Sequence, residues 1–263
     1  MLEIKFLANE KFREVIPEPQ PASNLFPKWF GEMKVSGKKC PLGFANRDNP
    51  FDIQYRKNVD PTSNITGCPG IADFLKYGYI IPAWDNFVFR EYQGDLVINW
   101  TDNIFRSKMA FHGTNQYPTM PKESHPLYSF IKIQSPWILK TSPGVSIMIT
   151  HPVWHRNKNF TSSTGILHTD ASPFAIPWFF EWNYKPKTGI QLEGMDVENQ
   201  IVERGTPLML IIPFYRNDYE STVEYVSDSE FERLEKVQNV KTNSLSNSDV
   251  YTKLRKTIGK LFR

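Results

Sequence analysis

The side chains of this chain that are best suited to chemistry are its histidines and the acids beside them. His168 and Asp170 form a His-x-Asp pair, a spacing in which a non-haem iron site takes two ligands from one strand end. No histidine follows His168, so a second imidazole would come from an earlier strand, with His151 or His112 as the choices. The pair therefore predicts one alternative function. This is a metal-dependent, oxygenase-like enzyme on a double-stranded β-helix fold, with Fe(II) held by His168, Asp170 and His151.

Other sequence motifs of catalysis are missing. A histidine more often has a hydrogen-bonded structural role than a catalytic one. The sequence contains no Gly-x-Ser-x-Gly, no Walker motif and no Gly-x-Gly-x-x-Gly. This excludes the serine-hydrolase elbow and the two common nucleotide-binding loops. We therefore predict no catalytic residue, and no cofactor outside the iron alternative.

A weaker alternative is a carbohydrate-binding module. Trp178 and Trp182 lie in a run of aromatic residues beside Glu181, and such rings can form a surface on which sugars stack. The same residues also fit an ordinary sheet, with the rings in the core and the acid in water. The position of the two tryptophans relative to the core decides between these interpretations.

The elements that would position these residues are mainly strands. Residues 86–92 and 95–101 alternate apolar and polar side chains on either side of Gln93-Gly94. This is the pattern of a tight β-hairpin whose core face carries Phe87, Phe89, Leu96, Ile98 and Trp100. Further strands are predicted over residues 128–133, 137–140, 145–150, 165–169, 175–184, 200–203 and 208–214.

Short strands separated by turns are typical of sandwiches and open barrels. The expected fold class is therefore mainly β, an antiparallel β-sandwich or open barrel of jelly-roll type. A short helix is expected near residues 70–77, with one or two α-helices at the C-terminus. Residues 1–226 would form the sandwich, with an extended N-terminal arm and long loops, and residues 227–263 a helical extension. Trp29 and Phe30 would either anchor the N-terminal arm on the core or form a contact surface.

The C-terminal extension carries its own helix signals. Ser227-Asp-Ser-Glu230 matches a capping box, and the polar residues 239–247 are predicted to form a flexible linker. Residues 248–262 then form a basic amphipathic helix with Leu254, Ile258 and Leu261 on its apolar stripe. Isolated helices of about 15 residues are marginal in water, so the stripe must pack on the domain or on another molecule. We expect a partner interface or self-association anchored by these three residues.

Composition and charge restrict the kinds of partner. The net charge is only +3, and basic and acidic residues are interleaved, which argues against nucleic-acid binding. The two cysteines, Cys40 and Cys68, are too few for a disulfide framework, and their spacing leaves open whether they pair. No apolar run approaches the roughly 20 residues of a membrane span, and Met1–Phe6 alternates like a strand rather than a signal peptide. We expect neither membrane insertion nor secretion by a signal peptide.

Several segments resemble a known family in their order along the chain. They are Lys39–Asn46, Cys68–Gly70 with Gly78–Pro82, Pro143–Pro152, His168–Asp170 and Arg204–Pro213. Together they are similar to an uncharacterised family, a domain of unknown function, found in tailed phages, especially marine ones, and in some bacteria. The resemblance covers roughly residues 40–215 and implies no activity. The sequence differs from that family's pattern at His168, where the pattern has an acidic residue. The resemblance implies a place in the virion or the host cytoplasm.

These observations predict a phage-type protein without enzymatic activity. The absent catalytic motifs, the long polar loops and the resemblance favour a protein-binding role or a structural or assembly role in a virion. A protein partner or self-association is expected.

Overall fold

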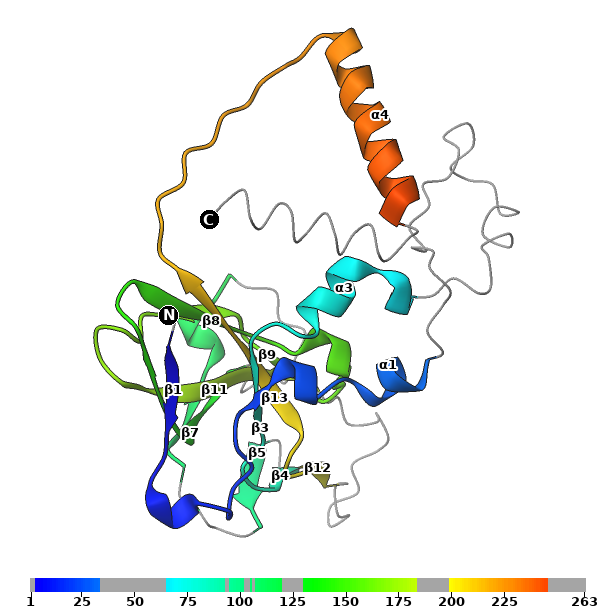
Figure 1. The fold of residues 1–263 in the computed structure, drawn as a ribbon. Coiled ribbons are helices and arrows are strands. Elements are labelled where there is room, and N and C mark those ends of the chain that lie inside the picture. The colour runs from blue at the N-terminus through cyan, green and yellow to red at the C-terminus, as the bar shows by residue number, and fades with distance from the viewer. Residues whose placement is uncertain are drawn as a thin grey trace. The chain divides into compact units, whose positions relative to one another are not determined.

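The computed structural model describes residues 3–33, 65–92, 95–101, 105, 107–119, 130–183 and 199–245 (Figure 1). The chain divides into two compact units. Unit 1 comprises Met1–Phe26 and Lys76–Asn217, and unit 2 comprises Pro27–Leu75 and Asp218–Arg263. The strands lie in unit 1, so this unit holds the sheets and the core that position the histidines.

The first sheet is built around a long central strand, β7 (Phe130–Thr141). One edge of β7 pairs with β11 (Phe174–Trp182), which pairs in turn with β9 (Phe160–Ser162). The other edge pairs at its two ends with β6 (Met109–His112) and β1 (Ile4–Leu7). All these pairings are antiparallel.

The second sheet has the order β10-β8-β13-β3-β2. Its strands are β10 (Gly165–Leu167), β8 (Val145–Thr150), β13 (Pro207–Tyr215), β3 (Tyr79–Pro82) and β2 (Gln20–Pro21). The third sheet has the order β12-β4-β5, formed by β12 (Gln200–Val202), β4 (Phe87–Tyr92) and β5 (Asp95–Trp100). No sheet closes into a barrel within the described strands. The predicted mainly β, antiparallel fold class is confirmed, and the sheets are consistent with a β-sandwich.

The hairpin predicted over residues 86–101 is confirmed. β4 and β5 pair antiparallel with Phe87 opposite Trp100 and Phe89 opposite Ile98. Phe87, Phe89 and Ile98 are buried, whereas Val97 on the other face is exposed. The connecting residues Gln93 and Gly94 lie outside the described part of the chain.

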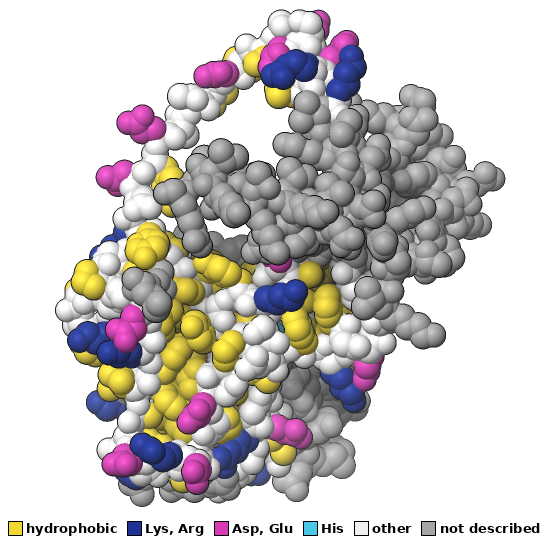
Figure 2. All heavy atoms as spheres, viewed as in Figure 1, with side chains coloured by type: hydrophobic (Ala, Val, Ile, Leu, Met, Phe, Trp, Pro, Cys, Tyr) yellow, Lys and Arg dark blue, Asp and Glu magenta, His cyan; other side chains and the backbone are white. Residues whose placement is uncertain are grey.

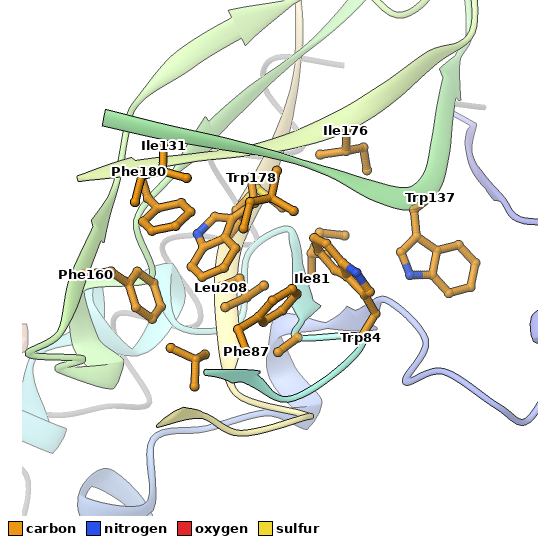
Figure 3. Packing of buried hydrophobic residues seen from close by; sticks show 14 of the residues in the cluster. Ile81, Trp84, Phe87, Ile131, Trp137, Phe160, Ile176, Trp178, Phe180 and Leu208 are labelled. Carbon is orange, nitrogen blue, oxygen red and sulfur yellow. The ribbon is translucent and has the colours of Figure 1, made fainter. Parts of the chain in front are cut away.

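One aromatic core joins the three sheets (Figure 3). Trp178 of β11 contacts Phe160 of β9, with ring centroids 5.0 Å apart, and Phe87 of β4, at 5.4 Å. Leu208 of β13 belongs to the same buried cluster. Alternation along each strand directs these side chains inward, and their burial is the main favourable contribution to folding.

The carbohydrate-binding alternative is wrong, because its two tryptophans are core residues. Trp178 is 0% exposed and Trp182 is 2% exposed. Trp182 stacks on Phe89 with ring centroids 3.8 Å apart. Rings enclosed on all sides have no face to offer to a sugar.

β7 corrects one strand prediction. The sequence suggested separate strands over residues 128–133 and 137–140, with a break near Pro136, whereas β7 runs unbroken through this proline. The neighbouring strands explain this, because β6 pairs with Phe130–Ile133 and β1 with Ile138–Thr141. Pro136 therefore falls in the gap between β6 and β1, where a missing N–H breaks no ladder bond. On the other edge, β11 shifts register between Ala175 and Pro177 and so accommodates the irregularity.

The helices are short apart from the last. They are η1 (Glu10–Phe12), η2 (Ala22–Asn24), α1 (Lys28–Glu32), η3 (Ile65–Gly67), α3 (Pro69–Phe74), η4 (Thr114–Gln116), η5 (Val153–His155) and α4 (Asp228–Leu245). α3 corresponds to the helix predicted near residues 70–77. Among the helices that the structure describes, none has the length and apolar character needed to span a membrane.

α4 corrects the predicted linker over residues 239–247. The helix continues through Leu245. The stretch contains no glycine or proline, so nothing in it ends a helix once the preceding turns have formed. The second C-terminal helix, with Leu254, Ile258 and Leu261, lies outside the described residues, as does Cys40.

Candidate functional site

A polar cluster lies where β13 ends, centred on Arg216. The backbone N–H of Arg216 donates to the Gly144 carbonyl at 2.9 Å. Its guanidinium forms a two-pronged ion pair with Asp170, in which Nη1 donates to Oδ1 at 2.9 Å and Nη2 donates to Oδ2. The Gly144 N–H also donates to Asp170 Oδ2, at 2.9 Å. Both carboxylate oxygens are therefore occupied by donors.

Gly144 can make these contacts because of its backbone conformation. Its φ is +78°, in the left-handed region that favours glycine. It lies in the turn between β7 and β8, which the Val145 N–H to Ser142 carbonyl bond closes at 3.1 Å. The turn thus presents one donor to Asp170 and one acceptor to Arg216.

Ser146 and His168 complete the cluster. Arg216 Nη1 donates to Ser146 Oγ at 2.7 Å, and Ser146 Oγ lies 2.7 Å from His168 Nδ1. A guanidinium only donates, so Ser146 Oγ accepts from Arg216, and the same hydroxyl shares a second hydrogen bond with His168 Nδ1 whose direction is set by the histidine tautomer.

This geometry does not form a Ser-His-Asp triad. Asp170 bonds Arg216, whereas a triad requires the acid to orient the histidine. Ser146 is 0% exposed and receives a cationic donor, so its oxygen is neither accessible to a substrate nor activated as a nucleophile. The cluster instead joins the end of β13 to β8 and to the loop after β10.

The charges of the cluster stabilise one another. The Arg216 guanidinium, and after it the Gly144 N–H, hold the pKa of Asp170 well below its usual range. In return, the hydrogen bond to Asp170 raises the pKa of Arg216. The side chain of Asp170 is 10% exposed, against 37% for Arg216. Asp170 is therefore a carboxylate and Arg216 a cation throughout the neutral range.

His151, the third predicted iron ligand, lies elsewhere. Its Nδ1 accepts from the Ser162 N–H at 3.1 Å, which places its proton on Nε2. Burial lowers the pKa of His151, and burial followed by the charge of His151 lowers that of His155. His151 follows the last residue of β8, whereas Ser146, the contact of His168, lies near its first. At about 3.3 Å per residue, the strand separates His151 from Ser146, and so from the cluster, by about 16 Å.

The structure therefore brings together His168 and Asp170 but not His151. Asp170 is engaged by Arg216 and Gly144, and His168 uses Nδ1 on Ser146. His112, the other histidine considered, bonds Gln116 through Nδ1 at 2.7 Å. The described residues contain no group of three or more His, Cys, Asp or Glu side chains placed to hold a metal ion.

Sequence reasoning missed Ser146 and Arg216, which hold the cluster together. Arg216 is the first charged residue after the apolar run of β13. This position in the sequence indicates where the strand ends, but it does not indicate which residue Arg216 contacts.

A second feature begins two residues after Arg216. Residues Asp218–Ser227, here called the arm, contain no helix, strand, turn or bend. Figure 1 shows the arm as an uncoiled stretch between β13 and α4. Tyr219 is 84% exposed, Val223 83% and Tyr225 97%. Three large side chains in a run of seven residues therefore lie in water.

The arm has two chemically different sides. In an extended chain, alternate residues share a side. Tyr219, Val223 and Tyr225 thus fall on one side, and Glu220 and Glu224 on the other. Figure 2 shows acidic side chains spaced along this stretch, and no Lys or Arg occurs between Asn217 and Glu232. The arm is an acidic, amphipathic, strand-like segment.

α4 follows the arm and begins as the capping box predicted. The Glu230 N–H donates to Ser227 Oγ at 3.4 Å, and the Phe231 N–H donates to the Ser227 carbonyl at 2.9 Å. The Glu230 carboxylate pairs with Arg233 instead of returning to the cap. Phe231 is 56% exposed and Leu234 46% exposed, so apolar exposure continues into the first turns of α4.

The predicted interface residues near the N-terminus lie in α1. Trp29 and Phe30 are half-buried, with ring centroids 5.7 Å apart in an edge-to-face arrangement.

Comparison with known proteins finds weak structural likenesses alone. No protein-family model matches the sequence, and no curated protein matches it either. A mutant dUTPase from phage phi11 of S. aureus is 12% identical, with a TM-score of 0.31, over 57% of this chain and 85% of that one. A mutant dUTPase of Staphylococcus bacteriophage 80alpha is 9% identical, with a TM-score of 0.35, over 86% of this chain and 99% of that one. Another mutant of that enzyme, with dUpNHpp, is 11% identical, with a TM-score of 0.28, over 57% of this chain and 79% of that one. At these sequence identities and TM-scores, the similarities support no conclusion about the activity of this chain.

Proposed function

We propose that this chain is a non-enzymatic protein-binding component that serves in a virion or in its assembly. The arm, together with the first turns of α4, is its binding surface. The observation that carries the proposal is the exposure of Tyr219, Val223 and Tyr225 at 84%, 83% and 97%.

The exposed side chains favour a protein partner for a physical reason. Apolar and aromatic side chains contribute stability when they leave water, at about 25 cal/mol per Å² of buried apolar surface. Tyrosine is enriched at protein interfaces, because its ring is buried while its hydroxyl finds a hydrogen bond. An extended segment with free backbone groups can also add to the edge of a sheet, where side chains on alternate positions provide the specificity.

The polar cluster supports the same proposal. Its titratable groups, Asp170 and His168, bond Arg216 and Ser146, and these contacts hold the end of β13 immediately before the arm. Fixing the residue at which an extended segment begins reduces the conformational freedom that binding has to remove. The role in a virion or its assembly comes from the resemblance of residues 40–215 to the phage family.

Site-specific photo-crosslinking tests the proposal. A photoreactive phenylalanine analogue replaces Tyr225, and as a matched control it replaces Tyr77, an exposed tyrosine outside the arm (55% exposed). In the cells that produce the protein, the Tyr225 position should give discrete protein adducts that the Tyr77 position does not. Adding Val223→Asp should remove them, because a buried carboxylate disrupts the apolar side of the arm.

Two outcomes would refute the proposal. One is the absence of adducts at Tyr225 and at Tyr219, and the other is an identical adduct pattern at Tyr77. The virion part has its own measurement, since mass spectrometry of purified particles should find the chain at a fixed copy number.

A further inference from the structure

We propose that the partner of the arm is a second copy of this chain, and that the arm binds there as an added strand beside β1. The inference rests on the proposed function, because it takes the arm to be the binding surface and identifies what it binds. It draws on the backbone edge of β1, on the lysines of its outer face and on the absence of a turn in the arm.

β1 offers an open edge. Among the described strands it pairs with β7 alone. The Ser142 N–H donates to the Glu3 carbonyl at 3.1 Å, so the backbone groups of Glu3 face β7. Hydrogen-bonding direction alternates along a strand, which turns the N–H and C=O groups of Ile4 and Phe6 toward the open side. An added strand would bond to these groups.

The outer face of β1 is basic. Lys5 lies directly opposite Lys140 of β7 in the ladder, and both side chains are exposed. Like charges directly opposite each other destabilise a sheet. Glu3 lies 3.2 Å from Lys5 and offsets part of this repulsion. The next pair on this face of the ladder is Leu7 with Ile138, which are 43% and 39% exposed. The face thus presents two cations beside two apolar groups.

The arm is complementary to both sides of β1. A strand added with Glu220 and Glu224 on the outer face places one of these carboxylates next to Lys5 on β1, with Lys140 one strand further away. The same orientation places the side with Tyr219, Val223 and Tyr225 next to Ile4 and Phe6, which pack against the core. Complementary charges fix the orientation of an added strand and exclude wrong partners.

The other edge strands fit the acidic arm less well. Of β1, β2, β5, β6, β9, β10 and β12, β1 is the one that carries a Lys or Arg within its own bounds. β2 contains Pro21, which lacks an N–H.

The arm favours a second copy over its own β1. No turn or bend interrupts Arg216–Ser227, and the segment contains neither glycine nor proline. Ten extended residues span about 33 Å, enough to lie along a neighbouring subunit. Reciprocal exchange between two copies makes two identical contacts and closes a dimer.

Charge reversal and mixing provide the test. One variant carries Glu220→Lys and Glu224→Lys, and the other carries Lys5→Glu and Lys140→Glu. All four positions are exposed, so both proteins should fold, and circular dichroism and melting temperature check this. In light scattering the wild type should be a dimer or larger, and each variant alone should be a monomer, because its arm and edge then carry like charges.

Mixing the two variants should restore assembly. The lysine arm of the first fits the glutamate edge of the second, and the glutamate arm of the second fits the lysine edge of the first. A wild type that is monomeric at all concentrations would overturn the proposal, as would variants that assemble like the wild type. A further outcome would overturn the proposal as well. If the two variants stay monomeric on mixing, and a single chain with all four substitutions behaves as the wild type, the arm binds its own β1. Adducts from Tyr225 to a different protein, without self-association, would remove the second copy and leave the proposed function standing.

Discussion

Asp170 and Arg216, which lie 46 positions apart in the sequence, meet in a two-pronged ion pair at the end of β13. The pair joins three pieces of chain, because the Gly144 N–H donates to the same carboxylate and the Gly144 carbonyl accepts from the Arg216 backbone. It therefore holds the last residues of unit 1 against the sandwich just before the arm begins. Two residues that the sequence suggested for metal chemistry, Asp170 and His168, take part in this contact.

Replacing Asp170 should lower stability in a pH-dependent way. Arg216 and Gly144 hold the pKa of Asp170 well below its usual range in the folded protein, whereas the unfolded chain titrates near 3.9. Because the folded pKa is depressed, the stabilisation is complete above about pH 5 and is lost as the pH falls through the unfolded value toward the folded one. Asp170→Asn should therefore melt below the wild type at pH 7, with a difference that shrinks below about pH 4. Asp218→Asn, at an exposed position of the arm, should melt like the wild type. A difference that is unchanged at low pH would contradict this assignment.

Replacing Phe89 with alanine should lower the stability strongly, because this side chain lies on the core face of the hairpin. The side chain is 1% exposed and stacks on Trp182, so Phe89→Ala should cost about 3–5 kcal/mol of unfolding free energy. Val97→Ala on the opposite face, where the side chain is 38% exposed, should cost much less. Trp100→Ala should fall between them, since Trp100 is half-buried. Denaturant unfolding measures all three, and equal effects would show that the two faces of the hairpin are not distinct.

The half-buried His151 and His155 should make the protein less stable in mild acid. Burial lowers the pKa of His151 and of His155, while the unfolded chain takes up protons near pH 6.5. A lowered histidine pKa disfavours the charged form in the folded state, so stability declines as the pH falls from about 7 toward 5. His151→Gln combined with His155→Gln should flatten that decline in urea unfolding. An unchanged slope in the double variant would assign the pH dependence to other groups.

Elemental analysis should find no stoichiometric metal that depends on His168. The Asp170 oxygens accept from Arg216 and Gly144, and His168 Nδ1 is hydrogen-bonded to Ser146. Protein reconstituted without oxygen in Fe(II), and separately in Mn(II) or Zn(II), should retain well under one equivalent. His168→Ala should not change that amount. One equivalent retained by the wild type and lost in His168→Ala would revive the iron alternative and refute the structural role assigned here.

Patterns confined to one element were predictable from the sequence. The alternation over residues 86–101 predicted both strands of the hairpin and their core face, because side-chain direction in a strand follows directly from position parity. The capping signal at Ser227 likewise predicted the start of α4, since the cap bonds lie within one turn. The mainly β class followed from the number of such strands.

Features that depend on neighbours were not predictable. Pro136 lies inside β7 because β6 and β1 leave a gap at that point, and no local pattern reports which strands flank a third. The strands β2, β3, β6 and β9 were missed for a related reason, since each acquires its pairing from its neighbours in the sheet.

The cluster at Arg216 shows most clearly what the sequence indicates and what the tertiary structure adds. Residue type and spacing identified His168 and Asp170 as side chains able to bind a ligand or an ion. Only the tertiary structure decided that Asp170 binds Arg216, because the energy of an ion pair depends on the distance between the two charges in space and not on their separation along the chain. Only the tertiary structure, likewise, left Tyr219, Val223 and Tyr225 in water, since burial is a property of what surrounds a side chain and not of the side chain itself.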